Sequence, residues 1–266
     1  MRFRVSDIQF TKMHGLGNDF VVIDGVNQTI HLTPDRIRQL ADRYRGIGFD
    51  QLLLLEASDD YDFTYRIFNA DGGEVAQCGN GARCAARFAH AKGLTDKQQL
   101  QFETRNGVVD VQMLENNLVK AGLAIPDVQA NQTIDGVAFG IVSLGNPHAV
   151  TLVDDIDTAP VTTFGPRVEN DALFVDRTNV GFMQIIDSSH IKLRVWERGV
   201  GETQACGSGA CAAVVIGRLQ HQLAETVTVQ LKGGELQIQW QGDSNLVNVI
   251  GLAEFVFDGV IRHSVA

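Results

Sequence analysis

Short apolar runs separated by turn residues recur along the chain, a pattern typical of strands. Thr33-Pro34-Asp35 predicts an N-cap followed by proline at the first helical position, and a surface helix from there to about Arg45. In the first half, the predicted strands are Gln51–Leu55, Phe63–Phe68, Leu100–Thr104 and Val108–Met113. The first half therefore combines several strands with few helices.

Two alanine-rich stretches predict buried helices. The first follows Cys78 and continues through Lys92, where Gly93 ends it. The second extends from Ser208 to about Gln220 and is apolar on most of its sides. A helix of that kind needs other elements around it, and the neighbouring strands can supply a curved sheet.

The two halves of the chain repeat one another at a constant offset. Residues 128 positions apart correspond, pairing Arg66 with Arg194, Phe68 with Trp196, Glu74 with Glu202, Cys78 with Cys206, Gln51 with Asn179 and Leu16-Gly-Asn18 with Leu144-Gly-Asn146. After the cysteines the offset falls to 127, which pairs Cys84 with Cys211. The register predicts an α+β protein of two homologous domains meeting near Pro126, each a curved, barrel-like mixed sheet around a central helix.

Composition narrows the class of partner. The 266 residues carry 22 Lys plus Arg against 32 Asp plus Glu, a formal net charge of -10. This balance disfavours nucleic acid and anionic membranes, and suits a small cationic or zwitterionic ligand. No apolar run is long enough for a signal peptide or a membrane span, and four cysteines do not indicate a disulfide scaffold, so we expect a cytoplasmic protein.

Candidate chemistry lies at Cys78 and Cys206, each at the end of a strand and just before Gly-x-Gly and a helix. A helix N-terminus presents unpaired N–H groups and roughly half a positive charge, which stabilise a thiolate or a carboxylate. An ordinary thiol has a pKa near ~8.5, and a helix dipole alone does not lower this pKa enough to make the thiol a base at neutral pH. Direct hydrogen bonds to the sulfur must therefore assist the dipole. Two thiols facing one cleft suit racemisation, in which one removes the α-proton and the other returns it.

Other uses of the cysteines fit less well. Free cysteines are most often small buried residues, and we assign that role to Cys84 and Cys211 inside the helices. The spacings C-x5-C and C-x4-C match no zinc site, C-x-x-C is absent, and no complete dinucleotide or phosphate loop occurs. We therefore expect no metal and no cofactor.

Several polar residues remain open to two interpretations. The asparagines at 18, 69, 146 and 179 are either turn formers or a binding shell in which Gln51 and Glu197 take part. His148 is either a surface residue or a functional one. Glu197 and Arg198 are either an exposed ion pair or a grip for the amine and carboxylate of an amino acid.

Seven motifs, in this order, resemble those of diaminopimelate epimerases. They are Met13-His-Gly-Leu-Gly-Asn-Asp-Phe20, Gly48-Phe-Asp-Gln51, Phe68-Asn-Ala-Asp-Gly72, Ala76-Gln-Cys-Gly-Asn-Gly-Ala-Arg83, Gly145-Asn-Pro-His148, Thr178-Asn-Val-Gly-Phe182 and the block from Glu197 to Cys211. The resemblance implies interconversion of L,L- and meso-diaminopimelate, without pyridoxal phosphate or metal, for lysine and peptidoglycan synthesis. It also implies domains at 1–125, completed by a strand at about 256–266, and at 126–255.

The resemblance assigns roles by position. It makes Cys78 and Cys206 the acid and base, with His148 and Glu197 assisting. The implied substrate-binding residues are Asn18, Gln51, Asn69, Gly79, Asn80, Asn146, Asn179, Glu197, Arg198, Gly207 and Ser208. A homodimer is implied, although Phe257 stands where a dimer-contact tyrosine is often found, and about eight residues precede the usual start at Gln9.

Two other functions remain possible on the residues alone. One is a two-cysteine racemase of the same fold that acts on proline or hydroxyproline. The other is a protein that binds a diamino acid without catalysis. A substrate panel separates the first from the epimerase, and solvent exchange of the substrate α-proton separates the second.

Overall fold

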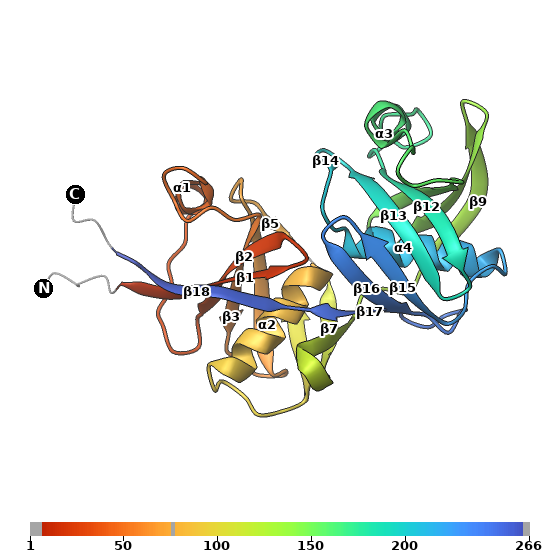
Figure 1. The fold of residues 1–266 in the computed structure, drawn as a ribbon. Helices are drawn as coiled ribbons and strands as arrows, with labels where there is room; N and C mark the ends of the chain where they lie inside the picture. The colour runs from red at the N-terminus through yellow and green to blue at the C-terminus, as the bar shows by residue number, and fades with distance from the viewer. Residues whose placement is uncertain (1–6, 76–77, 263–266) are drawn as a thin grey trace, which may run out of the picture. The chain divides into compact units, whose positions relative to one another are not determined.

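Each half of the chain folds a sheet around one buried helix, as the apolar pattern predicts. A computed structural model describes residues 7–75 and 78–262 (Figure 1). Unit 1 comprises Met1–Ala121 and Leu252–Ala266, and unit 2 comprises Gly122–Gly251. The predicted α+β class with two homologous domains is confirmed. Residues 76–77 of the first cysteine motif, most of the N-terminal extension and the end of the predicted final strand lie outside the described residues.

Unit 1 contains two helices longer than one turn, α1 and α2, among its described residues. In chain order its elements are β1 (Ile8–Gly15), β2 (Asn18–Asp24), α1 (Pro34–Ala41), β3 (Gln51–Glu56), β4 (Phe63–Asn69), β5 (Glu74–Val75), α2 (Gly79–Ala91), β6 (Gln99–Thr104), β7 (Gly107–Met113), a 3-10 turn (Glu115–Asn117), β8 (Leu118–Gly122) and, from the C-terminal end, β18 (Glu254–Ile261). All four strands predicted in this half are present.

Unit 2 repeats this succession. Its elements are β9 (Asp127–Ile134), β10 (Val137–Ser143), β11 (Pro147–Leu152), α3 (Val161–Glu169), β12 (Asn179–Asp187), β13 (His190–Glu197), β14 (Gly201–Glu202), α4 (Gly207–Leu219), β15 (Thr226–Leu231), β16 (Gly234–Gln239) and β17 (Asn248–Leu252). Helices α1 and α3 thus correspond, as do α2 and α4.

The two sheets have the same strand order. Hydrogen bonds connect β18-β1-β2-β3-β4-β6-β7-β8 in unit 1 and β9-β10-β11-β12-β13-β15-β16-β17 in unit 2. The C-terminal strand β18 pairs antiparallel with β1, with Ile8 opposite Ile261. In unit 1, β18 therefore takes the position beside β1 that β9 takes beside β10 in unit 2.

Parallel pairing explains why the helices stand where they do. In unit 1 the parallel pairs are β2 with β3 and β4 with β6, and in unit 2 they are β11 with β12 and β13 with β15. Parallel neighbours need a long crossover, which usually contains a helix. Helices α1 and α3 lie in the first crossover of each unit, and α2 and α4 in the second.

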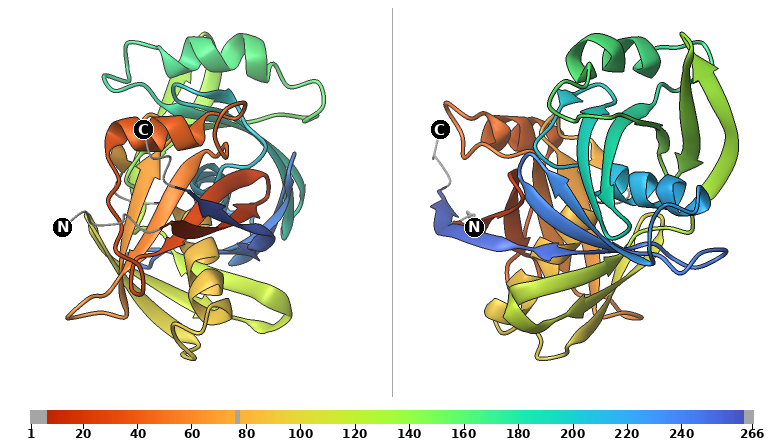
Figure 2. Two further views of the ribbon diagram at one scale, coloured as in Figure 1. Left: turned by 90° about the vertical axis from the view of Figure 1, so that its left-hand side faces the viewer. Right: turned by 45° about the vertical axis from the view of Figure 1, so that its right-hand side comes forward.

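Alternate residues of β2 and β3 point to opposite faces of the sheet. Val22 and Leu53 belong to the apolar cluster that includes α2, whereas Val21 and Leu52 belong to the cluster around Ile37 of α1. Side chains of a strand alternate between its two faces, so a strand whose two faces are both apolar is buried on both sides. The left view of Figure 2 accordingly shows α1 and α2 on opposite sides of this sheet.

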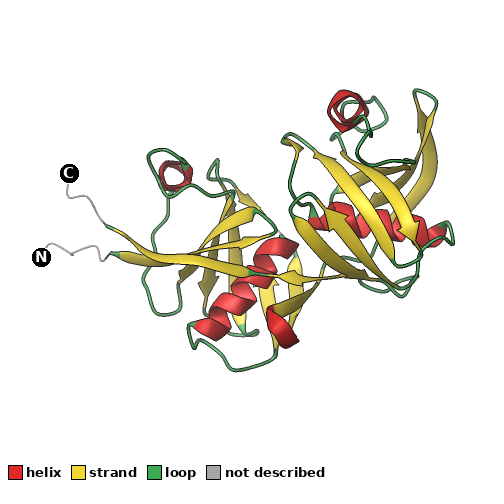
Figure 3. Cartoon of the chain, viewed as in Figure 1, coloured by secondary structure: helices red, strands yellow, loops and turns green. Residues whose placement is uncertain are grey.

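Helices α2 and α4 are flanked by strands of their own units (Figure 3). Helix α2 contacts β1, β2, β3 and β7, and α4 contacts β10, β11, β12, β13 and β16. Cys84 and Cys211, the cysteines assigned to the core, are fully buried within these helices. Burial raises the pKa of the Cys84 thiol to about 12, so it stays protonated.

Helix α1 is shorter than predicted. Thr33 caps it as expected, with its side chain accepting from the backbone N–H of Arg36. The helix ends at Ala41 instead of about Arg45, because the Asp42 side chain accepts from the backbone N–H groups of Tyr44 (2.8 Å) and Arg45 (2.9 Å). An aspartate that binds the following N–H groups closes a turn in competition with the helix.

The longest helices in the described part of the chain, α2 and α4, have 13 residues each. A membrane-spanning helix needs about 20. No helix within residues 7–75 and 78–262 is long and apolar enough to cross a membrane.

Candidate functional site: two cysteine-capped helices

Cys78 and Cys206 are the N-cap residues of α2 and α4. Both have extended backbone conformations, with φ of -150° and -123°, so each ends its loop and begins its helix. The predicted binding residues Gly79, Asn80, Gly207 and Ser208 form the first turns of these helices. The first N–H groups of a helix have no partner within it, so each unit presents donors beside a thiol.

Cys78 is half-buried, and its Sγ accepts from the backbone N–H of Gly81 at 3.3 Å. This bond takes the place that a serine or aspartate oxygen usually occupies at an N-cap. A side chain at position 81 would have no room, since its Cβ would lie 2.3 Å from the Tyr65 hydroxyl. Glycine at this position is therefore what allows the sulfur to approach the helix end.

Cys206 is 5% exposed, and its Sγ lies 3.7 Å from the hydroxyl of Ser208. Burial raises the pKa of the Cys206 thiol well above its usual value, and the nearby Glu197 carboxylate raises it further. The Ser208 hydroxyl and the nearby backbone N–H of Gly209 act in the opposite direction but do not outweigh these effects. At neutral pH Cys206 is therefore a protonated thiol, a proton donor.

Glu197 lies at the end of β13, at the position that Asn69 takes at the end of β4. Its carboxylate accepts a hydrogen bond from the Thr203 hydroxyl. In unit 1, Gln51 donates through Nε2 to Asn69 Oδ1 at 2.9 Å. The sequence repeat thus places a neutral amide pair in unit 1 where unit 2 has a carboxylate beside its cysteine.

Asn179 connects the strands that carry the unit 2 residues. Its Nδ2 donates to the carbonyl of Pro147 at 2.9 Å, and its Oδ1 accepts from the backbone N–H of Arg198 at 3.0 Å. Arg198 also donates through Nη1 to the carbonyl of Asp176 at 2.9 Å. Asn179 therefore fixes the backbone at Arg198.

A contact shared by both units joins the β-turn asparagine to the helix. Asn80 donates through Nδ2 to Asn18 Oδ1 at 3.2 Å, and Asn146 donates through Nδ2 to Ser208 Oγ at 3.4 Å. Asn80 and Ser208 are repeat partners, as are Asn18 and Asn146. The structure thus brings Asn18 and Asn80 together beside Cys78, and Asn146 and Ser208 together beside Cys206.

His148 is 1% exposed, not the surface residue that one sequence interpretation allows. Its Nε2 lies 3.0 Å from Asn146 Oδ1, and because the amide NH2 of Asn146 is used for Ser208, Nε2 is the donor. Burial, assisted by the positive charge of Arg198, lowers the pKa of His148 to about 3. The imidazole is therefore neutral and holds Asn146 in one orientation.

Sequence reasoning did not single out four residues that shape these surroundings. Arg83 is fully buried on α2 and donates to Asn80, Asp50 accepts from Asn18, Thr203 donates to Glu197, and the buried Tyr65 hydroxyl lies against Gly81. A charged residue on the buried face of an alanine-rich helix was the one available signal, at Arg83. Asp50 and Tyr65 take their importance from residues distant in the sequence, and Thr203 from Glu197, six positions before it.

Phe257 lies on β18, 49% exposed, with its ring edge-on to Phe10 at 6.0 Å between centroids. Its role in a dimer stays a prediction. Within residues 7–75 and 78–262, no three His, Cys, Asp or Glu side chains are grouped as metal ligands.

Solved structures of known proteins share this fold. One is a phenazine biosynthesis protein of the PhzF family from Bacillus anthracis, with 16% identity over 97% of this chain and 100% of that one, and a TM-score of 0.77. A hydroxyproline epimerase from Agrobacterium vitis has 15% identity over 98% and 94%, with a TM-score of 0.70. A probable proline racemase from Agrobacterium radiobacter has 15% identity over 97% and 93%, with a TM-score of 0.71.

The duplicated fold places the chain in the structural class that these racemase, epimerase and PhzF-family structures share. Within this class, the sequence model of the family described as diaminopimelate epimerase matches residues 10–125 and 140–256. The chain belongs to that family.

The buried neutral His148 makes stability depend on pH in a defined direction. An unfolded histidine titrates near ~6.5, whereas the folded pKa is about 3. Between these values only the unfolded chain takes up the proton, so the free energy of unfolding falls as the pH falls below ~6.5, by up to ~1.4 kcal/mol per pH unit. Urea unfolding between pH 7.5 and 5 should show this fall in the wild type and a smaller one in His148→Gln.

The control is His31→Gln, which replaces an exposed histidine of unit 1. It should keep the wild-type pH dependence. Equal slopes for the wild type and His148→Gln would show that His148 does not stay neutral on folding.

Proposed function

We propose that the protein interconverts L,L- and meso-diaminopimelate by moving the α-proton between Cys78 and Cys206, without a cofactor. The observation that carries the proposal is that both repeats place a cysteine at the N-cap of their buried helix. Family membership supports the substrate. In this proposal the enzyme serves lysine and peptidoglycan synthesis.

The proposed reaction needs a thiolate and a thiol at the start of each turnover. Cys206 fits the thiol, since burial and the Glu197 carboxylate raise its pKa. In that direction Cys78 is the thiolate, supported by the N-terminus of α2 and the N–H of Gly81. The thiolate removes the α-proton, the thiol delivers its own proton to the opposite face, and the reverse direction exchanges the roles.

Negative charge develops on the substrate carboxylate as the α-proton leaves. Backbone N–H groups at a helix N-terminus stabilise such charge without reorganising during the reaction. We assign this task to the first turns of α2 and α4, at Gly79, Asn80, Gly207 and Ser208. The charge of Arg198, with Glu197, would hold the second amino-acid head of diaminopimelate, and the neutral His148 would keep Asn146 oriented towards the substrate.

We further propose that the protein acts in the reducing cytoplasm as a homodimer. The number and spacing of its cysteines do not indicate a disulfide scaffold, which is typical of a protein in a reducing compartment. Strand β18 exposes Phe255, Val256, Phe257 and Val260 by 39 to 53%. An exposed apolar group of this kind commonly marks a protein–protein interface. The substrate is the only other partner we propose.

The two-thiol mechanism predicts a labelling pattern in D2O. Starting from L,L-diaminopimelate, early product should carry deuterium while recovered substrate stays largely unlabelled, because the donor thiol exchanges with solvent and the abstracting thiolate holds the substrate's proton. Mass spectrometry of both pools checks this. A single base that swings between faces would instead return much of the original hydrogen to the product.

Replacing Cys78 or Cys206 with alanine should reduce epimerisation by at least ~10²–10⁴-fold, the usual contribution of one acid or base. Cys84→Ala and Cys211→Ala are the matched controls and should change stability alone. Substantial epimerisation by Cys206→Ala would exclude the two-thiol mechanism.

The substrate's second head predicts specificity. L-Lysine lacks the second carboxylate and should be turned over about a hundredfold more slowly, the consequence of one unmet buried polar group at the upper end of its cost. A panel of L,L-diaminopimelate, L-lysine, L-proline and trans-4-hydroxy-L-proline, followed by α-proton exchange, checks this. Faster exchange of either proline compound would favour a proline or hydroxyproline racemase, and exchange of none would favour a binding protein.

The dimer proposal predicts that Phe257→Glu shifts the protein towards the monomer, since a charge would be buried in the contact without a partner. Sedimentation velocity measures the change. Val175→Glu is the control, because Val175 is 96% exposed and lies on unit 2. A Phe257→Glu protein with the wild-type sedimentation coefficient of a dimer would place the contact elsewhere.

A further inference from the structure

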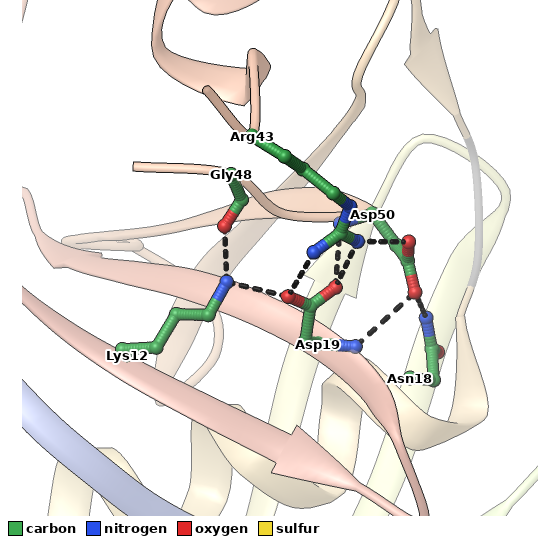
Figure 4. A network of polar contacts seen from close by, with 6 residues as sticks. All are labelled: Lys12, Asn18, Asp19, Arg43, Gly48 and Asp50. Carbon is green, nitrogen blue, oxygen red and sulfur yellow. Dashed lines mark hydrogen bonds and ion pairs between the residues drawn. The ribbon is translucent and has the colours of Figure 1, made fainter. Parts of the chain in front are cut away.

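A network of charged side chains in unit 1 ends at Asn18, which is joined to it through Asp50 (Figure 4). Asp50, just before β3, accepts from Asn18 Nδ2 at 2.8 Å and from the backbone N–H of Asp19 at 3.2 Å, both through Oδ2. Its other oxygen accepts from Arg43 Nη2 at 2.8 Å. Both oxygens of Asp50 are therefore held, and one of them holds Asn18.

Asp50 is itself anchored to β2 through Asp19. Its backbone N–H donates to Asp19 O and to Asp19 Oδ1, each at 3.0 Å. Burial raises the pKa of Asp19, but hydrogen bonds and charges from Arg43 and Lys12 outweigh it and lower that pKa to about 2. Lys12 also donates to the carbonyl of Gly48. This ionised cluster fixes the loop that carries Asp50.

The chain of hydrogen bonds continues on the other side of Asn18. Asn18 Oδ1 accepts from Asn80 Nδ2 at 3.2 Å, and Asn80 Oδ1 accepts from Arg83 Nη2 at 2.9 Å. Arg83 is fully buried and Asn80 is 6% exposed. Donation thus passes in one direction, from the Arg83 guanidinium through both amides to the Asp50 carboxylate.

The charged ends leave each amide one orientation. A guanidinium has donors and no acceptor, and a carboxylate has acceptors and no donor. Turning the Asn80 amide over would direct its NH2 at Arg83, and turning the Asn18 amide over would direct its carbonyl at Asp50. Each amide has one N–H and one carbonyl lone pair that this series of hydrogen bonds does not use. Arg83 and Asp50 determine the direction in which these remaining groups point.

Unit 2 orients its equivalent asparagine differently. Thr178 occupies the position that corresponds to Asp50, and Ser208 the position that corresponds to Asn80. There Asn146 is fixed by the neutral His148 and by Ser208. The series of hydrogen bonds that ends at Arg83 and Asp50 therefore occurs in the repeat that contains Cys78.

We propose that Asp50 and Arg83 are positioning residues for the epimerase reaction, acting by fixing the side-chain amides of Asn18 and Asn80. The proposal rests on the proposed function, in which these two asparagines bind the substrate beside Cys78. Asp50 and Arg83 act through the amides and do not touch the substrate. Their loss alters how the substrate is held at the reaction centre while the fold is retained.

The test uses Asp50→Asn, which keeps the shape and removes the charge. The new amide cannot accept from Asn18 and Arg43 as a carboxylate does, so Asn18 loses its fixed orientation. We expect kcat/KM for L,L-diaminopimelate to fall by about tenfold to a hundredfold, as for one mispaired polar group. Asp50→Glu, which restores the carboxylate, should recover part of the loss.

Asp62→Asn is the matched control. Asp62 accepts from Lys97 Nζ at 2.6 Å and from the backbone N–H of Gln101 at 2.8 Å, so it loses a similar set of partners in the same unit. The thermal stability of the Asp62→Asn protein should fall about as much as that of the Asp50→Asn protein, while its kcat/KM stays at the wild-type value. An Asp50→Asn protein with wild-type kcat/KM, or an equal loss in Asp62→Asn, would overturn the proposal.

A second measurement does not depend on activity. The wild type and both variants are labelled with ¹⁵N-asparagine and their spectra are compared. Asp50→Asn should shift the side-chain NH2 signals of both Asn18 and Asn80 from their wild-type positions, and Asp62→Asn should shift neither. If the wild type fails to epimerise diaminopimelate, the proposed function falls while these shifts still support positioning. Unchanged Asn18 and Asn80 signals in Asp50→Asn would overturn the positioning role whatever the substrate.

Discussion

The structure depends on how a buried helix begins. A helix inside a sheet has N-terminal N–H groups that need acceptors, and burial makes an unmet donor costly. In unit 1 the Cys78 sulfur accepts one of them, from Gly81, and a side chain at 81 would collide with the Tyr65 hydroxyl. The Cys78 cap, Gly81 and Tyr65 of β4 therefore depend on one another. Together they hold α2 in place and form the surroundings of the Cys78 thiol.

The duplicated framework carries two different electrostatic environments. In unit 1 the amides beside Cys78 lie between a buried guanidinium and a carboxylate, at Arg83 and Asp50. In unit 2 a carboxylate lies near Cys206, and a neutral histidine fixes the asparagine. A reaction that needs one thiol and one thiolate benefits from such unequal surroundings, because identical sites would favour the same protonation state in both.

The fold alone does not determine the substrate. Structures named for phenazine biosynthesis, hydroxyproline epimerisation and proline racemisation share it at 15 to 16% identity. Such breadth is expected when a common framework carries different side chains at its site. What separates this chain is therefore sought at the end of β13, where Glu197 and the following Arg198 lie. These residues carry the specificity that we propose.

The sequence by itself determined the duplication, the two capped helices and the strands, because these depend on local pattern and on a repeat register held over many residues. It also placed the asparagines at 18, 69, 146 and 179 near turn residues, but left their roles open. Only the tertiary structure decided that His148 is buried and neutral, and that Asn18 lies between Asp50 and Asn80. Those contacts join residues 32 and 62 positions apart. Burial and long-range pairing follow from packing, which no local pattern records.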